Sequence, residues 1–387
     1  MFRTLTLLGS TGSIGRQALQ VAARFPGRLR VAALSAGSNA ELLAKQALEF
    51  QPEVVHIGRA DLEGELRAAL GPGFRGEVLA GPQHLARVAA ETPADLVLVA
   101  TVGFTGLGPT LAALAAGRHI ALANKEVLVC GGHLVIPLAR AKGLHVLPVD
   151  SEHNAIFQCL ACGPVEALRR VVLTCSGGSF RNADAATIDT AGPAQTLRHP
   201  TWTMGSKITV DSATLMNKGF EVIEAHHLFD LPLDKIEVVI HPQSVIHSMV
   251  EYIDGSMIAQ LGRTDMRLPI QNILLYPERL ATDLPPISLS ELARLDFSEP
   301  DHERFPALRM AYEASAAGGS LPCALNAANE IAVAAHLDGA IPCGGIPRLL
   351  RAALDTWRDR PVDTLESLCD ADREARELAR GLLGAGV

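Results

Sequence analysis

Several features are scarce in this chain of 387 residues, and each scarcity excludes a class of protein. No uninterrupted apolar run approaches the roughly 18 residues that a membrane-spanning helix needs. Positive charge is not in excess, because 34 Lys and Arg face 42 Asp and Glu, so we expect neither nucleic acid nor a membrane as a partner. The seven cysteines are scattered and odd in number, and the first residues enter a strand pattern without the regions of a signal peptide. We therefore expect reduced thiols and a cytoplasmic location.

The N-terminal region has the pattern of a dinucleotide-binding fold. An apolar run, Thr4–Leu8, leads into glycines at positions 9, 12 and 15, and a helical pattern follows. Glycines let the backbone approach a pyrophosphate, and the start of the helix offers N–H groups to it. Because glycine-rich turns between a strand and a helix also occur without ligands, a turn without a ligand is the alternative.

The second apolar run, Leu29–Leu34, ends in the neutral segment Ser35–Asn39. A site for NAD usually places an acidic residue there, to hold the ribose 2′-hydroxyl. Small neutral donors instead favour NADP. The same residues also suit a helix N-cap, with Ser38 or Asn39 preceding Glu41, and the two interpretations are compatible.

Further strand patterns alternate with helical ones as far as residue 149. They are Val54–Ile57, Leu96–Ala100, His119–Ala123 and Leu144–Val149. This alternation predicts a Rossmann-like, doubly wound parallel α/β domain over residues 1–149. Ligands bind at the carboxyl ends of strands in such sheets, so Lys125 is expected in the cofactor crevice. A surface lysine in a salt bridge is the alternative.

The segment Asp150–Asn154 concentrates acidic groups directly after the last of these strands. If the strand continued through it, Asp150 and Glu152 would point to the same side. Carboxylates about 4 Å apart repel by about 4 kcal/mol at an effective dielectric of about 20, so a shared proton, a cationic side chain or a metal must offset the repulsion. Ligand sets made only of oxygen favour Mg²⁺ or Mn²⁺ over zinc. The alternative is a solvated acidic turn.

From residue 150 the pattern changes to that of an α+β domain. Strands are predicted at 171–175, 207–211, 236–240 and 245–250, with a hairpin turn at 253–256. We expect a largely antiparallel sheet in a second domain over residues 150–276, with a hairpin edge suited to pairing across a dimer. Residues 277–306 are rich in proline and acidic groups and are predicted to be a linker. Residues 307–387 are predicted to form a helical domain.

Two segments of this region carry hydrogen-bond donors. Ser176–Ser179 follows a predicted strand and is typical of an anion-binding turn. Ser212–Glu221 opens a helix on which Asn217, Lys218 and Glu221 share a face, and an amide with an ammonium near a helix start suits a phosphate. A capped helix with an ordinary ion pair is the alternative.

The loop His199–Gly205 holds Trp202, one of only two tryptophans. Such a loop is suited to covering a site and excluding water. A tryptophan packed beneath its own loop is the alternative.

Seven segments resemble those of the 1-deoxy-D-xylulose 5-phosphate reductoisomerase family, in the same order over nearly the whole chain. They are Gly9–Gly15, Ala123–Glu126, Pro148–Gln158, Val210–Thr214, Met216–Gly219, His241–Met249 and Leu325–Glu330. The resemblance implies a homodimeric enzyme of three domains that depends on NADPH and on Mg²⁺ or Mn²⁺. It would convert 1-deoxy-D-xylulose 5-phosphate into 2-C-methyl-D-erythritol 4-phosphate in non-mevalonate isoprenoid synthesis.

The same resemblance implies residue roles. As metal ligands it implies Asp150, Glu152 and Glu221, which form the catalytic set together with Lys125. The residues implied to bind substrate are Lys125, Ser151, Glu152, Ser176, His199, Trp202, Ser212, Asn217, Lys218 and Glu221. Those implied to bind NADPH are Thr11, Gly12, Ser13, Ile14, Gly37, Ser38, Asn39, Asn124, Glu126 and Gly205. Some members carry lysine where this chain has Ser38, so the grip on the 2′-phosphate is expected to differ.

A metal in such a site would polarise the substrate ketone before hydride transfer. Both a retro-aldol and aldol sequence and a direct ketol shift are compatible with these residues. The alternative function is that of an NADP-dependent dehydrogenase of a phosphorylated substrate without an isomerase step. His247, on a predicted strand, is expected to orient the metal-binding carboxylates, or else to be a packed core residue.

Overall fold

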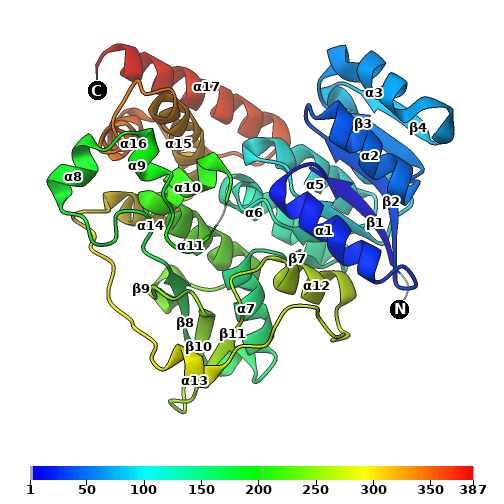
Figure 1. Ribbon diagram of the computed structural model, residues 1–387. Coiled ribbons are helices and arrows are strands. Elements are labelled where there is room, and N and C mark those ends of the chain that lie inside the picture. The colour runs from blue at the N-terminus through cyan, green and yellow to red at the C-terminus, as the bar shows by residue number, and fades with distance from the viewer. Residues whose placement is uncertain (1–2, 203, 387) are drawn as a thin grey trace. The chain divides into compact units, whose positions relative to one another are not determined.

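The computed structural model describes residues 3–202 and 204–386, which form two compact units (Figure 1). Unit 1 comprises Met1–Val127, His133–Asn154 and Asp265–Asp283. Unit 2 comprises Leu128–Gly132, Ala155–Thr264 and Leu284–Val387. Each unit is therefore assembled from three separate stretches of the chain.

Unit 1 is built around a seven-stranded parallel sheet, which confirms the predicted doubly wound fold. Its strand order is β4-β3-β2-β1-β5-β6-β7, so the order reverses beside β1, where such folds bind ligands. Most side chains of the central strands are buried, as expected for a sheet covered on both faces. The strands are β1 (Arg3–Leu8), β2 (Leu29–Ala36), β3 (Val54–Ile57), β4 (Glu77–Ala80), β5 (Leu96–Val99), β6 (His119–Leu122) and β7 (Val146–Pro148).

Helices connect these strands, and each buries one face. In the first of them, Ala18, Leu19 and Ala22 recur at helical spacing and are buried. The last helix of unit 1, α12 (Arg267–Leu275), comes from much later in the chain and packs against the first. The connecting helices are α1 (Ser13–Arg24), α2 (Ala40–Phe50), α3 (Glu63–Leu70), α4 (Leu85–Glu91), α5 (Leu107–Ala115) and α6 (Glu126–Ala141).

The strand before the acidic segment ends earlier than the sequence suggested. β7 stops at Pro148 and α7 (Ser151–Leu160) begins two residues after Val149, so no strand continues through Asp150 and Glu152. The backbone oxygen of Asp150 instead accepts from the N–H of Asn154 at 2.8 Å, in the first turn of the helix. The two carboxylates are therefore placed by a helix start, not by the alternation of a strand.

Unit 2 contains a four-stranded sheet in the order β11-β10-β8-β9. The strands are β8 (Leu168–Cys175), β9 (Ile236–Ile240), β10 (Ile246–Tyr252) and β11 (Met257–Leu261). β10 runs antiparallel to both of its neighbours, whereas β8 and β9 are parallel, so the sheet is mixed and largely antiparallel, as expected. The predicted hairpin turn is confirmed between β10 and β11, where Gly255 has a φ of +84° that favours glycine.

One predicted strand is wrong. The segment 207–211 lies in a helix, α10 (Ser206–Ala213), which follows the extended residue Gly205. Its β-branched run favours a strand by propensity, but Lys207 and Asp211 form an ion pair one helical turn apart, at 2.8 Å. Tertiary contacts of the buried Asp211, described below, override the local preference.

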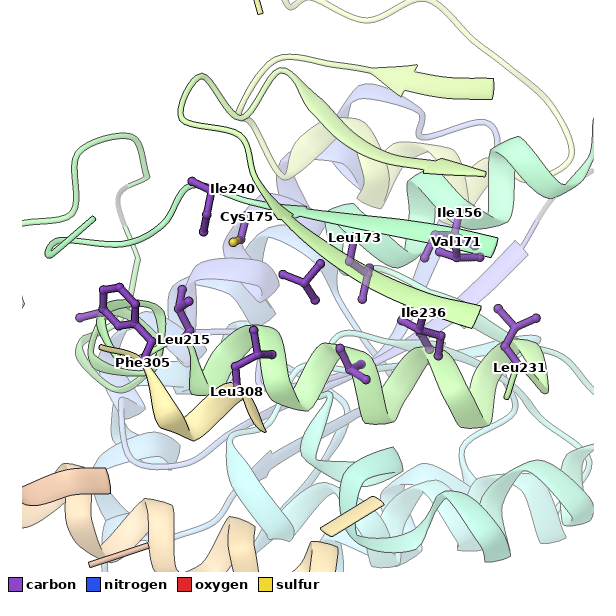
Figure 2. Packing of buried hydrophobic residues seen from close by; sticks show 14 of the residues in the cluster. Ile156, Val171, Leu173, Cys175, Leu215, Leu231, Ile236, Ile240, Phe305 and Leu308 are labelled. Carbon is purple, nitrogen blue, oxygen red and sulfur yellow. The ribbon is translucent and has the colours of Figure 1, made fainter. Parts of the chain in front are cut away.

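The hydrophobic core of unit 2 lies between its sheet and a helix, α11 (Met216–Phe229). Figure 2 shows side chains from the strands, including Val171, Leu173 and Ile236, pointing toward this helix. Leu308 joins the same cluster from α14 (Pro306–Ala317). At about 25 cal/mol per Å², burying each of these side chains stabilises the fold by roughly 1.5–3 kcal/mol, so this cluster holds α11 against the sheet.

The rest of unit 2 is helical, as predicted for residues 307–387. The predicted linker is not wholly irregular, because it contains α13 (Leu289–Leu292) and an antiparallel bridge between Ser298 and Ile240. Among the described residues, no helix is both long and apolar enough to cross a membrane. The remaining helices are α8 (Ala185–Thr190), α9 (Pro193–Thr196), α15 (Leu321–Leu337), α16 (Gly345–Thr356) and α17 (Leu365–Gly384).

Candidate active site

The glycine-rich turn after β1 leaves no room for side chains. A Cβ on Gly9, whose φ is +92°, would lie 2.3 Å from the carbonyl oxygen of Ala100. A Cβ on Gly15 would lie 2.3 Å from the carbonyl oxygen of Gly9. Gly12 is the N-cap of α1 and makes no side-chain hydrogen bond, so no N-cap side chain satisfies the N–H groups of the first turn. This close-packed, uncapped helix start suits the pyrophosphate of a dinucleotide, and Thr11, Ser13 and Ile14 lie on it.

The loop after β2 is exposed at Gly37, Ser38 and Asn39. The Oδ1 atom of Asn39 accepts from the N–H of Leu42 at 3.0 Å, so Asn39 is the N-cap of α2. The predicted N-cap is therefore confirmed for Asn39. The exposed side chain of Ser38 and the backbone of Gly37 remain accessible to a ligand.

Asn124 lies after β6 and is almost completely buried. Its Nδ2 atom donates to the hydroxyl of Thr101 at 3.1 Å and to the carbonyl oxygen of Gly103 at 2.9 Å. Its Oδ1 atom is buried without a hydrogen-bond partner. Leaving a buried acceptor without a hydrogen bond costs about 1–3 kcal/mol, and a donor on a bound cofactor would remove this cost. The neighbouring Glu126 begins α6 and is also buried.

Lys125 and Asp150 form an ion pair within unit 1. The Nζ atom of Lys125 lies 2.5 Å from Oδ2 of Asp150, and the side chains are only 8% and 16% exposed. Lys125 is therefore not the surface lysine of the alternative interpretation. Oδ1 of Asp150 accepts from the N–H of Ser151 at 2.9 Å, and the Ser151 hydroxyl donates to Oε2 of Glu152 at 2.5 Å. A cationic side chain thus offsets part of the repulsion expected in this acidic segment.

In unit 2 the turn after β8 is shaped by Gly177 and Gly178, both with positive φ. The N–H of Gly178 donates to the Ser176 hydroxyl at 3.2 Å. A Cβ on Gly178 would lie 2.4 Å from the backbone oxygen of Ser212, at the end of α10. The turn and the α10 end are therefore in close contact, which brings the predicted ligands Ser176 and Ser212 into one region.

His199 connects this turn to the tryptophan loop. Its Nδ1 atom accepts from the backbone N–H groups of Thr201 at 3.2 Å and Trp202 at 2.9 Å. A nitrogen that accepts carries no proton, so Nε2 is protonated and donates to the Ser176 hydroxyl oxygen at 3.0 Å. Burial, and then the charge of Arg181, lower the pKa of His199, which favours this neutral form. The Ser176 oxygen thus accepts twice, and its own proton is available to a ligand.

The ring of Trp202 lies 6.1 Å from the ring of His247 on β10. His247 is buried, and its Nε2 atom is 3.3 Å from the backbone oxygen of Arg263. Trp202 is therefore partly buried beside β10, and movement of its loop stays a prediction. Thr203 lies outside the described residues, and Gly205 is the N-cap of α10.

Three predicted ligands are hydrogen-bonded to one another at the start of α11. The Nδ2 atom of Asn217 donates to Oε1 of Glu221 at 2.6 Å, and Lys218 Nζ donates to Oε2. The side chains of Lys218 and Glu221 are only 2% and 1% exposed. The Lys–Glu pair of the alternative interpretation is formed, but it is buried instead of solvated, and a role of these residues as ligands stays a prediction. Removing one partner of a buried pair costs about 3–5 kcal/mol, so this cluster is strongly coupled.

The sequence did not predict the contact that fixes α10. Asn329 on α15 donates from Nδ2 to Oδ1 of Asp211 at 2.8 Å, while Lys207 contacts Oδ2 of the same carboxylate at 2.8 Å. Asp211 is 1% exposed. The spacing of Lys207 and Asp211 was the available signal for a helix, but only the folded chain shows that α15 holds α10, and with it Ser212, in position.

A glycine-rich turn at the switch point of a parallel sheet, beside the unsatisfied acceptor of Asn124, is suited to a dinucleotide. Unit 2 adds hydroxyl, amide, ammonium and carboxylate groups that are buried or partly buried, and such groups suit a charged substrate better than an apolar core. Together they define a dinucleotide-dependent oxidoreductase that acts on an anionic substrate.

Comparisons with known proteins identify the particular family. Three family models match the chain: 1-deoxy-D-xylulose 5-phosphate reductoisomerase over residues 5–132, its C-terminal domain over residues 146–229, and DXP reductoisomerase C-terminal domain over residues 261–378. The chain belongs to the 1-deoxy-D-xylulose 5-phosphate reductoisomerase family.

Individual relatives span the full length of the chain. The reductoisomerase of Gloeobacter violaceus is 52% identical over 381 residues, covering 98% of this chain and 97% of the relative. The reductoisomerase of Chlorobaculum tepidum is 51% identical over 386 residues, covering 99% of this chain and 100% of the relative. Among solved structures, the Zymomonas mobilis enzyme in complex with NADPH has a TM-score of 0.92 at 44% identity, covering 99% of both chains. A reductoisomerase in complex with NADPH, fosmidomycin and magnesium has a TM-score of 0.94 at 40% identity, covering 99% of this chain and 98% of that one.

Proposed function

We propose that this protein is an NADPH- and Mg²⁺-dependent enzyme that rearranges 1-deoxy-D-xylulose 5-phosphate and reduces the product to 2-C-methyl-D-erythritol 4-phosphate. Family membership over the whole chain supports this proposal. The single observation that carries it is the hydrogen-bonded cluster of Asn217, Lys218 and Glu221 at the start of α11, in which Lys218 and Glu221 are buried. A simple hydride-transfer enzyme has no need for a buried carboxylate next to a phosphate-type cluster.

NADPH would be held by unit 1. The tight turn at Gly9 and Gly15 and the uncapped start of α1 fit its pyrophosphate. The unsatisfied acceptor of Asn124, the loop Gly37–Asn39 and Glu126 are proposed to contact the rest of the cofactor. Gly205, which belongs to unit 2, is proposed to contact it as well. When bound, NADPH supplies the hydride.

Mg²⁺ or Mn²⁺ would be bound by Asp150, Glu152 and Glu221. These donors are all carboxylate oxygens, which are the ligands that such hard ions prefer. Each of two of them already faces an ammonium: Asp150 faces Lys125 and Glu221 faces Lys218. When bound, the metal supplies a Lewis acid for the substrate ketone and the adjacent hydroxyl.

The substrate phosphate is proposed to bind in unit 2. The available hydroxyl proton of Ser176 and the donors Ser212, Asn217 and Lys218 match the acceptor oxygens of a phosphate. Holding the phosphate keeps a rearranging substrate in place between steps, so that the groups that must react stay close together. In unit 1, Lys125 Nζ is proposed to stabilise negative charge on a substrate oxygen, and Ser151 to hold Glu152 in orientation.

Two measurements test this function. NADPH oxidation should require both 1-deoxy-D-xylulose 5-phosphate and Mg²⁺ or Mn²⁺, and should stop on chelation of the metal. Product analysis separates the alternative: a branched 2-C-methyl-D-erythritol 4-phosphate supports the proposal, whereas an unbranched reduced sugar phosphate identifies a dehydrogenase without an isomerase step.

We also propose a homodimer that forms through the β11 edge. Among the described residues, β11 pairs only with β10, and the exposed apolar side chains Met257 and Leu261 lie on it, with Ile253 in the turn. An open apolar edge favours pairing with a second copy. Light scattering should give twice the chain mass, and Met257→Lys should lower it; a monomeric wild-type protein would exclude the dimer.

The remaining assignments follow from these proposals. Residues 1–149 are proposed to bind NADPH, 150–276 to catalyse and dimerise, 277–306 to link, and 307–387 to form the helical domain. A cytoplasmic location is proposed because none of the seven cysteines forms a disulfide.

A further inference from the structure

Arg59 is held against the loop that follows β2. β2 and β3 are neighbours in parallel register, with Ala36 opposite Ile57. Beyond the strands, the N–H of Gly58 donates to the backbone oxygen of Ala36 at 2.8 Å. The N–H of Arg59 then donates to the backbone oxygen of Gly37 at 3.0 Å. The backbone of Arg59 is therefore fixed about one strand spacing, roughly 5 Å, from this loop.

The loop itself carries no positive charge. Ser38 is neutral, and the Oδ1 atom of Asn39 is engaged with the N–H of Leu42. In a dinucleotide-binding sheet the ribose 2′ position lies at the end of β2, and an arginine nearby accommodates a 2′-phosphate. A phosphate at this loop therefore needs a cation from a neighbouring element.

We propose that Arg59 binds the 2′-phosphate of NADPH and so sets the preference of this chain for NADPH over NADH. The inference rests on the proposed function, because it assumes that a dinucleotide binds unit 1. Arginine suits the role, since its planar fork of N–H donors matches phosphate oxygens two at a time.

The present partner of Arg59 is exchangeable. Its Nε atom donates to Oδ1 of Asp61 at 3.1 Å and its Nη2 atom to Oδ2, with both side chains about three-fifths exposed. Exposed pairs of this kind contribute little to stability, so a doubly charged phosphate can replace the carboxylate. Asp61 and the nearby Glu65 also repel a phosphate, so Asp61 should restrain the affinity for NADPH.

A purely structural role makes a different prediction. Arg59 precedes a short 3₁₀ turn, Ala60–Leu62, and its ion pair with Asp61 could simply hold that turn. In that case, replacing Arg59 would change stability but would not distinguish ligands by their 2′-phosphate.

The test measures binding of four ligands to the full-length protein by titration calorimetry: NADPH, NADH, 2′,5′-ADP and 5′-AMP. Arg59→Gln removes the charge, Asp61→Asn releases the arginine, and Arg67→Gln is the matched control. Arg67 is also an exposed arginine paired with a carboxylate, Glu63, but it lies on α3. In Arg59→Gln the loss of one charge-assisted contact should weaken the binding of NADPH and 2′,5′-ADP by roughly 10- to 100-fold. The affinities for NADH and 5′-AMP should change less than about twofold.

Asp61→Asn should bind NADPH tighter than the wild type, and Arg67→Gln should match the wild type. Equal affinities of Arg59→Gln and Arg67→Gln for 2′,5′-ADP would overturn the role of Arg59 while leaving the proposed function intact. Wild-type protein that binds NADH as tightly as NADPH would instead refute the choice of cofactor, and with it the basis of this inference.

Discussion

The two ring nitrogen atoms of His199 have different roles, and two substitutions can test each role by itself. Nδ1 accepts from the backbone of the tryptophan loop, and Nε2 donates to Ser176. Asn has an oxygen on a short side chain that accepts N–H groups two or three residues ahead, as Nδ1 of His199 does from Thr201 and Trp202. Gln is longer and keeps a donor that can reach Ser176, as Nε2 does, but it loses the local acceptor. His199→Asn should therefore preserve the loop, and His199→Gln should preserve the contact with Ser176.

The magnitude follows from the bonds lost. Each intramolecular hydrogen bond contributes about 1 kcal/mol, so losing both of these partly buried bonds costs about 2 kcal/mol, or roughly 30-fold in the equilibrium between the ordered and open loop. Limited proteolysis within residues 199–205 measures that equilibrium. We expect cleavage roughly 30 times faster in His199→Gln but less than about threefold faster in His199→Asn, with a raised KM for the phosphorylated substrate in the latter.

The same contact predicts a pH dependence. The pKa of His199 is lowered in the folded protein, so the neutral ring contributes stability that is fully present above the unfolded value of about 6.5. That contribution is lost as the pH falls through the lowered folded pKa, because protonated Nδ1 no longer accepts. Loop cleavage in the wild type should therefore rise below pH about 6.5, and this rise should be absent in His199→Asn. Equal cleavage of His199→Asn and His199→Gln at pH 7.5 would refute the reasoning.

Three further predictions concern the proposed site. If Trp202 belongs to a moving lid, its fluorescence and the protection of its loop should change when a phosphonate substrate mimic and NADPH are added, and an unchanged loop would count against movement. His247→Ala should weaken metal dependence or turnover by roughly 10- to 100-fold, as for residues that orient ligands, and unchanged values would make His247 a packed core residue. Glu221→Gln should fold and bind NADPH but lose about a hundredfold in turnover, about 3 kcal/mol, with a raised metal requirement. Asp150→Asn should behave alike, and the double variant should lose less than the sum; wild-type metal affinity in Glu221→Gln would remove Glu221 from the metal site.

Periodicity was sufficient for most of the fold. β3 has the bounds that the sequence predicted, and the turn after β10 lies where its glycine indicated, because both signals are local. The strand predicted for residues 207–211 was wrong because the contact that decides its structure is not local. Its β-branched residues favour a strand, but the buried carboxylate of Asp211 is paired with Asn329, which is more than a hundred positions away in the chain. No local pattern carries that information.

The site shows the same division. Motifs indicated which residues matter, whereas their partners depended on the fold. The sequence left open what offsets the charge of Asp150, and the structure shows Lys125 beside it. Likewise, the spacing of Lys218 and Glu221 predicted a shared face, but only tertiary packing makes that pair buried.

The interleaved assembly of unit 1 has a consequence for how the protein forms during synthesis. Its sheet is complete once β7 has been made, but α12 and the residues around it belong to Asp265–Asp283. There, Arg24 meets Asp283 at 2.7 Å and Arg28 meets Glu278 at 2.9 Å. Residues 155–264 must leave the ribosome first, which takes roughly 5–20 s at typical rates. During that interval one face of α1 is not yet packed against α12. A chain released before residue 283 should therefore expose apolar surface and be a substrate for chaperones or proteases.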